Sequence, residues 1–179
     1  PAPTHNFDKN YVPGGDYAGL GALAGPTQEM VEEYELATGG KPDWSKWRSK
    51  TTETPPYELL EPRFKASILY NGASWKGRKI EAFVGGADGF QDYGSASASN
   101  GHTVTGYFLR KNLDEKNTDV EKTLSTQPWI EIRLAEVYLN LAEAATELKD
   151  AATANQALTA VRKRVSLPWS AKTGDALMQ

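Results

Sequence analysis

Residues 129–165 read WIEIRLAEVYLNLAEAATELKDAATANQALTAVRKRV, and this stretch decides the fold class. In residues 129–148, apolar side chains recur every three or four positions, which is the period of an amphipathic helix. They are Ile130, Leu134, Val137, Tyr138, Leu141, Ala145 and Leu148. After a short turn at Lys149-Asp150, the same period continues over residues 151–165. Its members are Ala154, Ala157, Leu158, Val161 and Val165. The stretch therefore predicts two antiparallel helices.

Two helices across about 34 residues are typical of one helix–turn–helix repeat of the tetratricopeptide kind. Alanines at the facing positions let two backbones approach closely. A single repeat cannot bury both of its faces, and such arrays usually need about three units or more. No second copy occurs among the 179 residues. We therefore expect the partner helices elsewhere, and we expect the chain to be cut at both ends.

Residues 1–127 have a different character, because they hold most of the glycines, prolines and aromatic residues. A short helix is predicted from Pro26, with Thr27 as its N-cap and Gly39-Gly40 as its end. Residues 41–62 read as a polar loop that carries two tryptophans. This part of the chain therefore predicts a loop-rich region with small elements of regular structure.

A β-hairpin is predicted next. Residues 64–70 are β-prone, Asn71-Gly72 is a hairpin-turn dipeptide, and residues 75–84 would form the returning strand. The packing candidates on that strand are Trp75, Ile80 and Phe83. A further strand is expected over residues 102–109, followed by a polar linker over residues 110–127.

The expected fold class is thus mainly α, with irregular loops and small β-hairpins and with one tetratricopeptide-like helical hairpin. We expect a loop-rich aromatic region over residues 1–127, the helix pair over residues 128–168, and a truncated tail over residues 169–179. Together they would form one structural unit of a larger protein.

The composition excludes several function classes. The net charge is −3, from 20 Lys and Arg against 23 Asp and Glu, so no strong field favours nucleic acid or an anionic membrane surface. The absence of cysteine removes a disulfide framework, a thiolate zinc site and a cysteine nucleophile. No apolar run approaches the ~20 residues of a membrane span. The chain begins Pro1-Ala2-Pro3, without an initiator Met or the features of a signal peptide.

Four groups of motifs follow one another along residues 26–168. They are Pro26-Thr27-Gln28-Glu29-Met30-Val31; Glu61-Pro62-Arg63-Phe64 with Tyr70-Asn71-Gly72 and Trp75-Lys76-Gly77; Thr105-Gly106-Tyr107-Phe108-Leu109-Arg110-Lys111; and Arg133-Leu134-Ala135-Glu136-Val137-Tyr138-Leu139-Asn140 with Glu143-Ala144, Val161-Arg162-Lys163-Arg164 and Leu167-Pro168. In this order they resemble the SusD/RagB family. The sequence departs from the family at Glu61, where Asp is favoured, and at Val165-Ser166, where Ala-Gly is usual.

The resemblance implies a mostly helical fold, in which tetratricopeptide-like pairs support an irregular, loop-rich half. It implies a surface-exposed outer-membrane lipoprotein that binds oligosaccharide or polysaccharide and passes it to a TonB-dependent, SusC-like transporter, without catalysis. Because intact members are far longer, it implies an inner-to-C-terminal segment. The signal peptide and the lipid anchor, which would be the only link to a membrane, would then lie outside this chain.

Neutral glycans offer apolar ring faces and many hydroxyls, so their sites need flat aromatic platforms and a few polar partners. Trp44 and Trp47 are the leading platform candidates, because they lie three apart in a polar stretch where burying both would be awkward. Tyr17 and Tyr93, in glycine-rich loops, are further candidates. The alternative for each ring is packing against neighbouring elements.

No catalytic residue, metal ligand or cofactor is expected. The glycines of residues 19–24 lack the strand and helix of a dinucleotide site. His5 and His102 suggest no metal or triad chemistry, and Glu136 and Glu143 suggest ordering of the helical hairpin rather than an acid–base pair. Two other functions stay open. One is a helical-repeat module that binds another protein, and the other is a carbohydrate-active enzyme.

Overall fold

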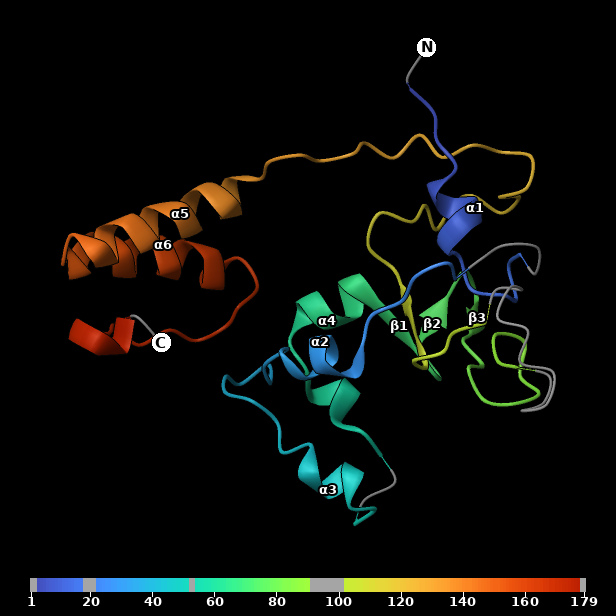
Figure 1. Ribbon diagram of the computed structural model, residues 1–179, viewed down its shortest axis with the longest axis horizontal. Coiled ribbons are helices and arrows are strands. Elements are labelled where there is room, and N and C mark those ends of the chain that lie inside the picture. The colour runs from blue at the N-terminus through green and yellow to red at the C-terminus, as the bar shows by residue number, and fades with distance from the viewer. Residues whose placement is uncertain (1–2, 18–21, 52–53, 91–101, 178–179) are drawn as a thin grey trace. The chain divides into compact units, whose positions relative to one another are not determined.

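A computed structural model describes residues 3–17, 22–51, 54–90 and 102–177 of the chain (Figure 1). The chain divides into two compact units. The first unit comprises Pro1–Tyr34 and Arg63–Trp129, and the second comprises Glu35–Pro62 and Ile130–Gln179. Residues 35–62, which the sequence grouped with the aromatic region, thus belong to the same compact unit as the helix pair.

The elements are short outside the helix pair. The first unit holds α1 (Phe7–Tyr11), α2 (Gln28–Glu32), α4 (Pro62–Ser67, whose first residue the division assigns to the second unit), β1 (Ile68–Tyr70), β2 (Ser74–Trp75), β3 (Arg78–Lys79) and β4 (Tyr107–Leu109). The second unit holds α3 (Ser45–Arg48), the 3₁₀ turn η1 (Pro56–Leu59), α5 (Leu134–Glu147), α6 (Ala151–Lys163) and the 3₁₀ turn η2 (Gly174–Leu177). The fold class expected from the sequence, mainly α with small antiparallel strand pairs, is confirmed.

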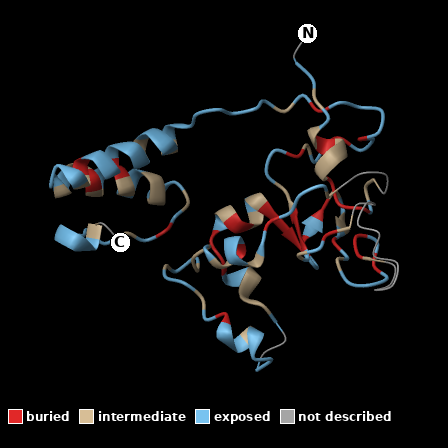
Figure 2. Cartoon of the chain, viewed as in Figure 1, coloured by how far each residue is buried: buried red, intermediate tan, exposed pale blue. Residues whose placement is uncertain are grey.

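The core of the first unit forms around α4 and β1, where Figure 2 shows buried residues gathered. Phe64 is fully buried, and its ring stacks on Tyr70 with the centroids 5.2 Å apart. Tyr34 meets Phe64 edge-on at 5.4 Å. The other large side chains of this core are Val31, Ile68, Leu69, Trp75, Ile80 and Phe108.

The short helix expected from Pro26 is confirmed as α2. The Thr27 hydroxyl accepts a hydrogen bond from the Met30 amide at 3.3 Å, so Thr27 is the predicted N-cap. The helix ends at Glu32, earlier than expected, because the chain turns again before the glycines. Gly39 and Gly40 instead form a tight turn at positive φ, where the Leu36 amide donates to the Gly40 carbonyl at 2.8 Å.

The predicted hairpin is wrong in its pairing. Residues 62–67 form α4, because Pro62 at the first position is preorganised for a helix. The strand that follows, β1, pairs antiparallel with β4 in the register Leu69–Phe108. Residues 70–73 turn into β2, which pairs with β3 across Lys76-Gly77. Both turn residues have positive φ, 45° and 79°, as a type I′ hairpin requires.

The packing expected along the returning strand is confirmed for Trp75 and Ile80, each 1% exposed, and is wrong for Phe83, which is 54% exposed. The chain leaves the strand ladder after Ile80 and folds around a carboxylate instead. Asp88 is fully buried and accepts hydrogen bonds from the Glu81 amide at 2.9 Å, the Gly15 amide at 2.9 Å and the Arg78 guanidinium at 2.7 and 2.8 Å.

This carboxylate ties residues 13–16 to the β2–β3 hairpin. Asp16 lies 3.5 Å from the Arg78 guanidinium and accepts a hydrogen bond from the Trp75 indole N–H at 2.5 Å. A Cβ at position 15 would lie 2.7 Å from the Arg78 Nη2 atom, so a larger residue there would displace the guanidinium that binds Asp88. A buried ion-pair cluster therefore fixes the N-terminal loop of the first unit.

The helical hairpin of the second unit is confirmed. Ala142 and Ala145 of α5 and Ala154 and Ala157 of α6 are all buried, so the two helices meet through alanines. The Asp150 carboxylate caps α6 by accepting from the Thr153 amide at 3.1 Å.

The expected start of the first helix at Trp129 is wrong. Helix α5 begins at Leu134, and Arg133 before it has an extended backbone (φ −121°, ψ 149°). No side chain caps this end, and the β-branched Ile130 and Ile132 favour the extended form. Residues 129–133 therefore precede the helix and do not form its first turn.

The outer face of α5 is apolar and exposed. Leu134, Val137 and Leu141 are 68%, 52% and 45% exposed, and Leu148 just after the helix is 81% exposed. Figure 2 shows the exposed colour along this helix. Within the residues that the structure describes, the helical pair thus buries one face only.

Candidate functional site

The two candidate tryptophans lie on a loop whose ends are joined. We call residues 35–61 the tryptophan loop. At its neck the Glu61 amide donates to the Glu35 carbonyl at 2.9 Å, and the Ala37 amide donates to the Leu59 carbonyl at 2.8 Å. Leu36 and Leu60 form an antiparallel bridge between these bonds. The two ends of the loop are therefore held together within the second unit.

Two short helical turns, α3 and η1, lie within residues 41–62, which the sequence predicted to be a polar loop. Asp43 starts α3 by accepting hydrogen bonds from the Ser45 amide at 3.1 Å and from the Ser45 hydroxyl. The hydroxyl hydrogen bond is the main cause that lowers the pKa of Asp43 below its ordinary value. Pro55 and Pro56 lead into η1 on the returning side, with Pro56 at its first position.

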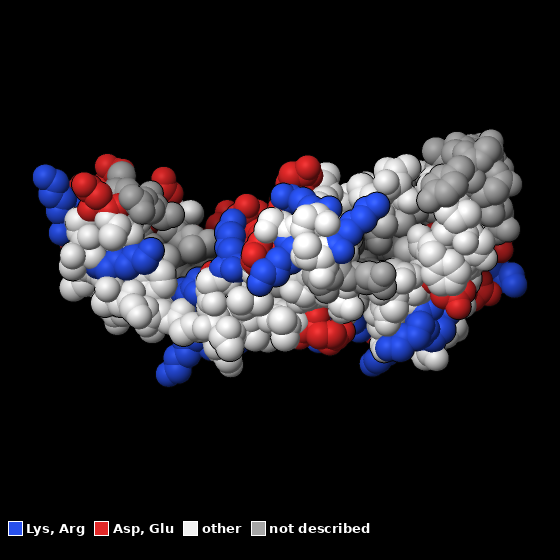
Figure 3. Space-filling model, turned by 90° about the horizontal axis from the view of Figure 1, so that it is seen from below, with Lys and Arg blue, Asp and Glu red and all other residues white. Residues whose placement is uncertain are grey.

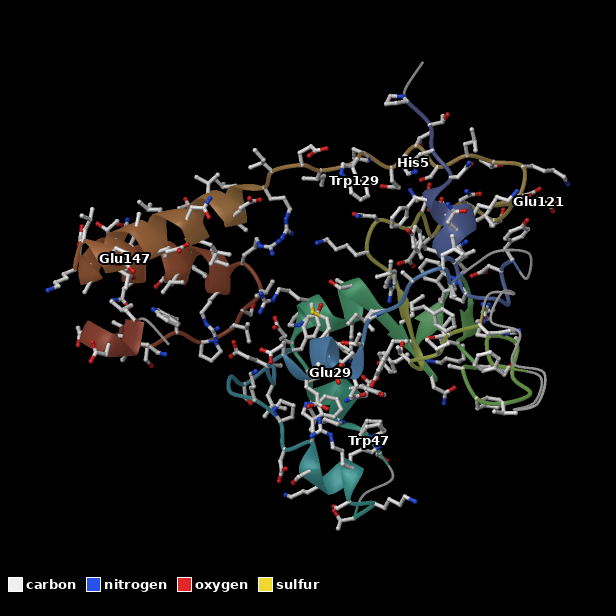
Figure 4. All side chains as sticks on the ribbon, viewed as in Figure 1. His5, Glu29, Trp47, Glu121, Trp129 and Glu147 are labelled. Atoms are coloured by element: carbon white, nitrogen blue, oxygen red, sulfur yellow. The ribbon has the colours of Figure 1, made fainter. Side chains whose placement is uncertain are left out.

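Three aromatic rings gather inside the tryptophan loop. Trp44 meets Trp47 in a T-shaped arrangement, with ring centroids 6.1 Å apart, and lies 6.2 Å from Tyr57. Trp44 is 5% exposed, whereas Trp47 and Tyr57 are half-buried. Trp47 lies on α3 (Figure 4). Of the two rings, Trp47 thus offers the surface that a ligand could reach, and Trp44 supports it from within.

The burial of Trp44 leaves one polar group without a partner. Its indole N–H is enclosed and makes no hydrogen bond. A buried donor without an acceptor costs about 1–3 kcal/mol. The aromatic cluster therefore carries a small energetic penalty within the loop.

The neck of the loop is attached to the helical hairpin by an ion pair. The two terminal guanidinium nitrogens of Arg162 on α6, Nη1 and Nη2, donate to the Glu35 carboxylate, at 2.6 and 2.7 Å. These hydrogen bonds raise the pKa of Arg162. The Arg162 Nε atom also donates to the Pro168 carbonyl at 2.9 Å, and the guanidinium lies 5.5 Å from the centroid of the Trp169 ring.

Neither of the other two candidates belongs to the described part of the second unit. Tyr17 belongs to the first unit, is half-buried, and has the Lys9 ammonium 5.3 Å from its ring centroid. Tyr93 lies outside the described residues. The structure therefore brings together Trp44 and Trp47 and adds Tyr57, which the sequence reading missed. The only sequence signal for Tyr57 is its place next to Pro55-Pro56, which returns the chain toward the loop's start.

Three of the residues weighed for catalysis are placed as follows by the structure. Glu136 and Glu143 are both exposed on α5. His5 joins the Gln127 carbonyl at 2.7 Å and thereby ties the N-terminal segment to residues 125–127. His5 and Trp129 lie at one end of the first unit (Figure 4). The described residues contain no cluster of three or more acidic or histidine side chains placed to hold a metal ion.

The helices were also compared with the length of a membrane-spanning helix. In the part of the chain that the structure describes, no helix combines the length and apolarity needed to cross a bilayer. The longest, α5, has 14 residues.

The sequence matches the SusD family over residues 3–178. The chain belongs to the SusD family. The resemblance drawn from the four groups of motifs is therefore confirmed. No curated protein matches the chain.

Solved SusD-like structures share the fold. A SusD-like protein from Bacteroides fragilis NCTC 9343 is 27% identical, with a TM-score of 0.67, over 94% of this chain and 34% of that one. A SusD-like carbohydrate binding protein from the same strain is 23% identical, with a TM-score of 0.62, over 86% of this chain and 30% of that one. The chain thus spans about a third of the length of the SusD-like proteins that it matches.

Proposed function

We propose that this SusD-family chain forms part of a protein that binds oligosaccharide or polysaccharide without catalysis. Membership of the family carries the proposal. A fold neighbour is described as a SusD-like carbohydrate binding protein, which supports the same ligand class. The protein would act at the cell surface, anchored to the outer membrane by a lipid, and would deliver glycan to a SusC-like, TonB-dependent transporter.

The tryptophan loop is the proposed contact with the glycan. Trp47 would stack on the apolar face of a sugar ring, because its ring is half-buried and held from one side by Trp44. Tyr57 would contribute ring surface beside it. Tyr17 and Tyr93 are retained as secondary platforms. Affinity should fall between about micromolar and millimolar, or roughly −8 to −4 kcal/mol.

Titration calorimetry with glycans selected on a broad array tests this proposal. Trp47→Ala should weaken binding at least about tenfold, which corresponds to ~1.4 kcal/mol. The control is Trp129→Ala, because Trp129 is 64% exposed and lies in the other unit. Equal binding by the wild-type chain and the Trp47→Ala variant would remove the loop from the site, and binding of no glycan would overturn the function.

The exposed apolar face of α5 favours a second function, docking to another protein. Leu134, Val137 and Leu141 present that face. Retention of one protein partner in a pull-down, without any glycan response, would favour this reading. Release of reducing sugar that a single carboxylate substitution abolishes would instead favour an enzyme.

A further inference from the structure

Two carboxylates mark the ends of the tryptophan loop, and one cation interacts with both. Glu35 begins the loop and Glu61 ends it, and the Glu61 amide donates to the Glu35 carbonyl at 2.9 Å. Glu61 is only 1% exposed. The hydrogen bonds and the charge of Glu35 raise the pKa of Arg162, and the charge of Glu61 acts in the same direction. Arg162 therefore offsets negative charge at both ends of the loop.

The Glu35 carboxylate also closes the first turn of the loop. Its Oε2 atom accepts from the Gly40 amide at 3.3 Å as well as from Arg162. Gly39, in the same turn, approaches the chain after α6 so closely that a Cβ there would lie 2.7 Å from the Pro168 Cγ atom. Arg162 donates to the carbonyl of that same proline at 2.9 Å. The neck of the loop is therefore held by α6 and by the segment that follows it.

A series of packed rings leads from the neck to the accessible tryptophan. The turn η1 carries Tyr57 and ends at the neck, where its Leu59 carbonyl accepts one of the neck hydrogen bonds. Tyr57 lies 6.2 Å from Trp44, which meets Trp47 at 6.1 Å. Closely packed side chains transmit a displacement rather than absorb it. A change at the neck can therefore reach Trp47.

We propose that Arg162 is a positioning residue for the glycan contact at Trp47, and that it acts by holding the two ends of the tryptophan loop together. This inference rests on the proposed function and goes beyond it, because Arg162 acts without touching the glycan. Glu35 and Glu61 repel each other when the cation that interacts with both is removed, so the neck opens more readily. A loop held in its binding form loses less conformational entropy when it binds, which strengthens binding.

Trypsin provides a test that needs no glycan. Lys46, Arg48 and Lys50 are exposed on the loop, and Figure 3 shows Lys and Arg side chains near the centre of the view, over α3. Cleavage at these sites requires local opening of the chain. Arg162→Gln should raise their cleavage rate at least about threefold, since such cleavage follows the population of the open form. Cleavage at Lys122, an exposed site of the first unit, should stay unchanged.

Titration calorimetry measures the effect on binding. The probe is the tightest-binding glycan among soluble oligosaccharides of glucose, mannose and xylose, at a temperature where all variants are folded. Arg162→Gln should weaken its binding by about fivefold through the added cost of ordering the loop. Arg162→Lys keeps the charge but not the two-pronged contact, so it should restore part of the affinity. The control is Arg164→Gln, at the exposed C-cap of the same helix, which should bind like the wild-type chain.

A double-mutant cycle with Trp47→Ala distinguishes positioning from a general structural role. If Arg162 acts through Trp47, Arg162→Gln should weaken binding little further once Trp47 has been replaced. An equal loss of affinity with and without Trp47 would overturn the inference.

The remaining outcomes separate the inference from the proposed function. If Arg162→Gln binds the probe as tightly as the wild-type chain, or if trypsin cleaves its loop no faster, the positioning role is wrong and glycan binding stands. If the wild-type chain binds none of these oligosaccharides and no glycan on the array, both fall.

Discussion

Glu35 and Arg162 are 127 residues apart in sequence and form a two-pronged ion pair with N–O distances of 2.6 and 2.7 Å. Glu35 stands at the neck of the tryptophan loop, and Arg162 stands on α6. The pair therefore connects the loop that carries the candidate site to the helical hairpin. Both side chains are about one-fifth exposed, at 22% and 20%, so solvent screens the interaction only partly.

Replacing Arg162 with Ala should destabilise the second unit by about 2 kcal/mol, because it removes charge-assisted hydrogen bonds and leaves Glu35 without that cation. Urea unfolding followed by tryptophan fluorescence measures the loss. Arg164→Ala, an exposed neighbour, is the control and should change stability little. A double-mutant cycle with Glu35→Ala that returns no coupling energy would contradict the role given to this pair.

Two tryptophans offer a matched test of hydrogen bonding. Trp75→Phe removes an indole N–H that donates to Asp16 at 2.5 Å, whereas Trp44→Phe removes one without a partner. Both side chains are at least 95% buried, at 1% and 5% exposed. We expect Trp75→Phe to cost about 1–3 kcal/mol more than Trp44→Phe in denaturant unfolding. Equal costs would mean that the lone N–H of Trp44 finds an acceptor in solution.

The Asp88 cluster predicts a pH dependence. Burial acts to raise the pKa of Asp88, but hydrogen bonds from Arg78 and from the Glu81 and Gly15 amides outweigh it and lower the pKa below 3.8. The stabilisation is therefore complete above about pH 4 and is lost as pH falls through the lowered pKa. Asp88→Asn should cost about 3 kcal/mol at pH 7.

That cost should shrink as the pH falls toward about 3, because only the wild-type chain has this charge to lose. Comparing the two proteins by urea unfolding at each pH removes the contribution of all other acids. Asp119→Asn, at an exposed acid, serves as the control. A cost for Asp88→Asn that stays constant down to low pH would contradict the lowered pKa.

The exposed face of α5 should make the chain associate. Val137→Glu and Leu141→Glu together should reduce the weight-average mass in sedimentation, since exposed apolar patches drive association. Helix content should stay constant because both side chains are exposed to solvent, at 52% and 45%. Glu136→Gln and Glu143→Gln change exposed positions of the same helix as a control. Unchanged association in the Glu variant would show that this face is inert.

The sequence predicted the elements that local signals dictate. Thr27 caps its helix as predicted, because its hydroxyl accepts from an amide of the first turn. The second helix of the hairpin begins at Ala151, directly after the predicted turn at Lys149-Asp150. The alanine seam between α5 and α6 followed from a helical period that needs no distant partner. The SusD-family assignment likewise came from ordered motifs and is confirmed by the family match.

The errors arose where distant residues decide the local structure. Residues 64–67 are β-prone, yet Pro62 and the burial of Phe64 favour a helix there. The partner of β1 is β4, about 40 residues away, and no local turn signal encodes that pairing. The ion pair between Arg162 and Glu35 was not predicted either, because neither charged residue carries a sequence signal for a partner 127 residues away.

The joined ends of the tryptophan loop have a consequence for how this region can vary. Because Ala37 and Leu59 are joined by a hydrogen bond, the segment between them, residues 38–58, begins and ends at the same place. A segment of different length or composition could replace residues 38–58 without moving either end. Exchanging this loop, by grafting in the laboratory or by recombination between related sequences, could therefore change the ligand preference and leave the rest of the fold in place.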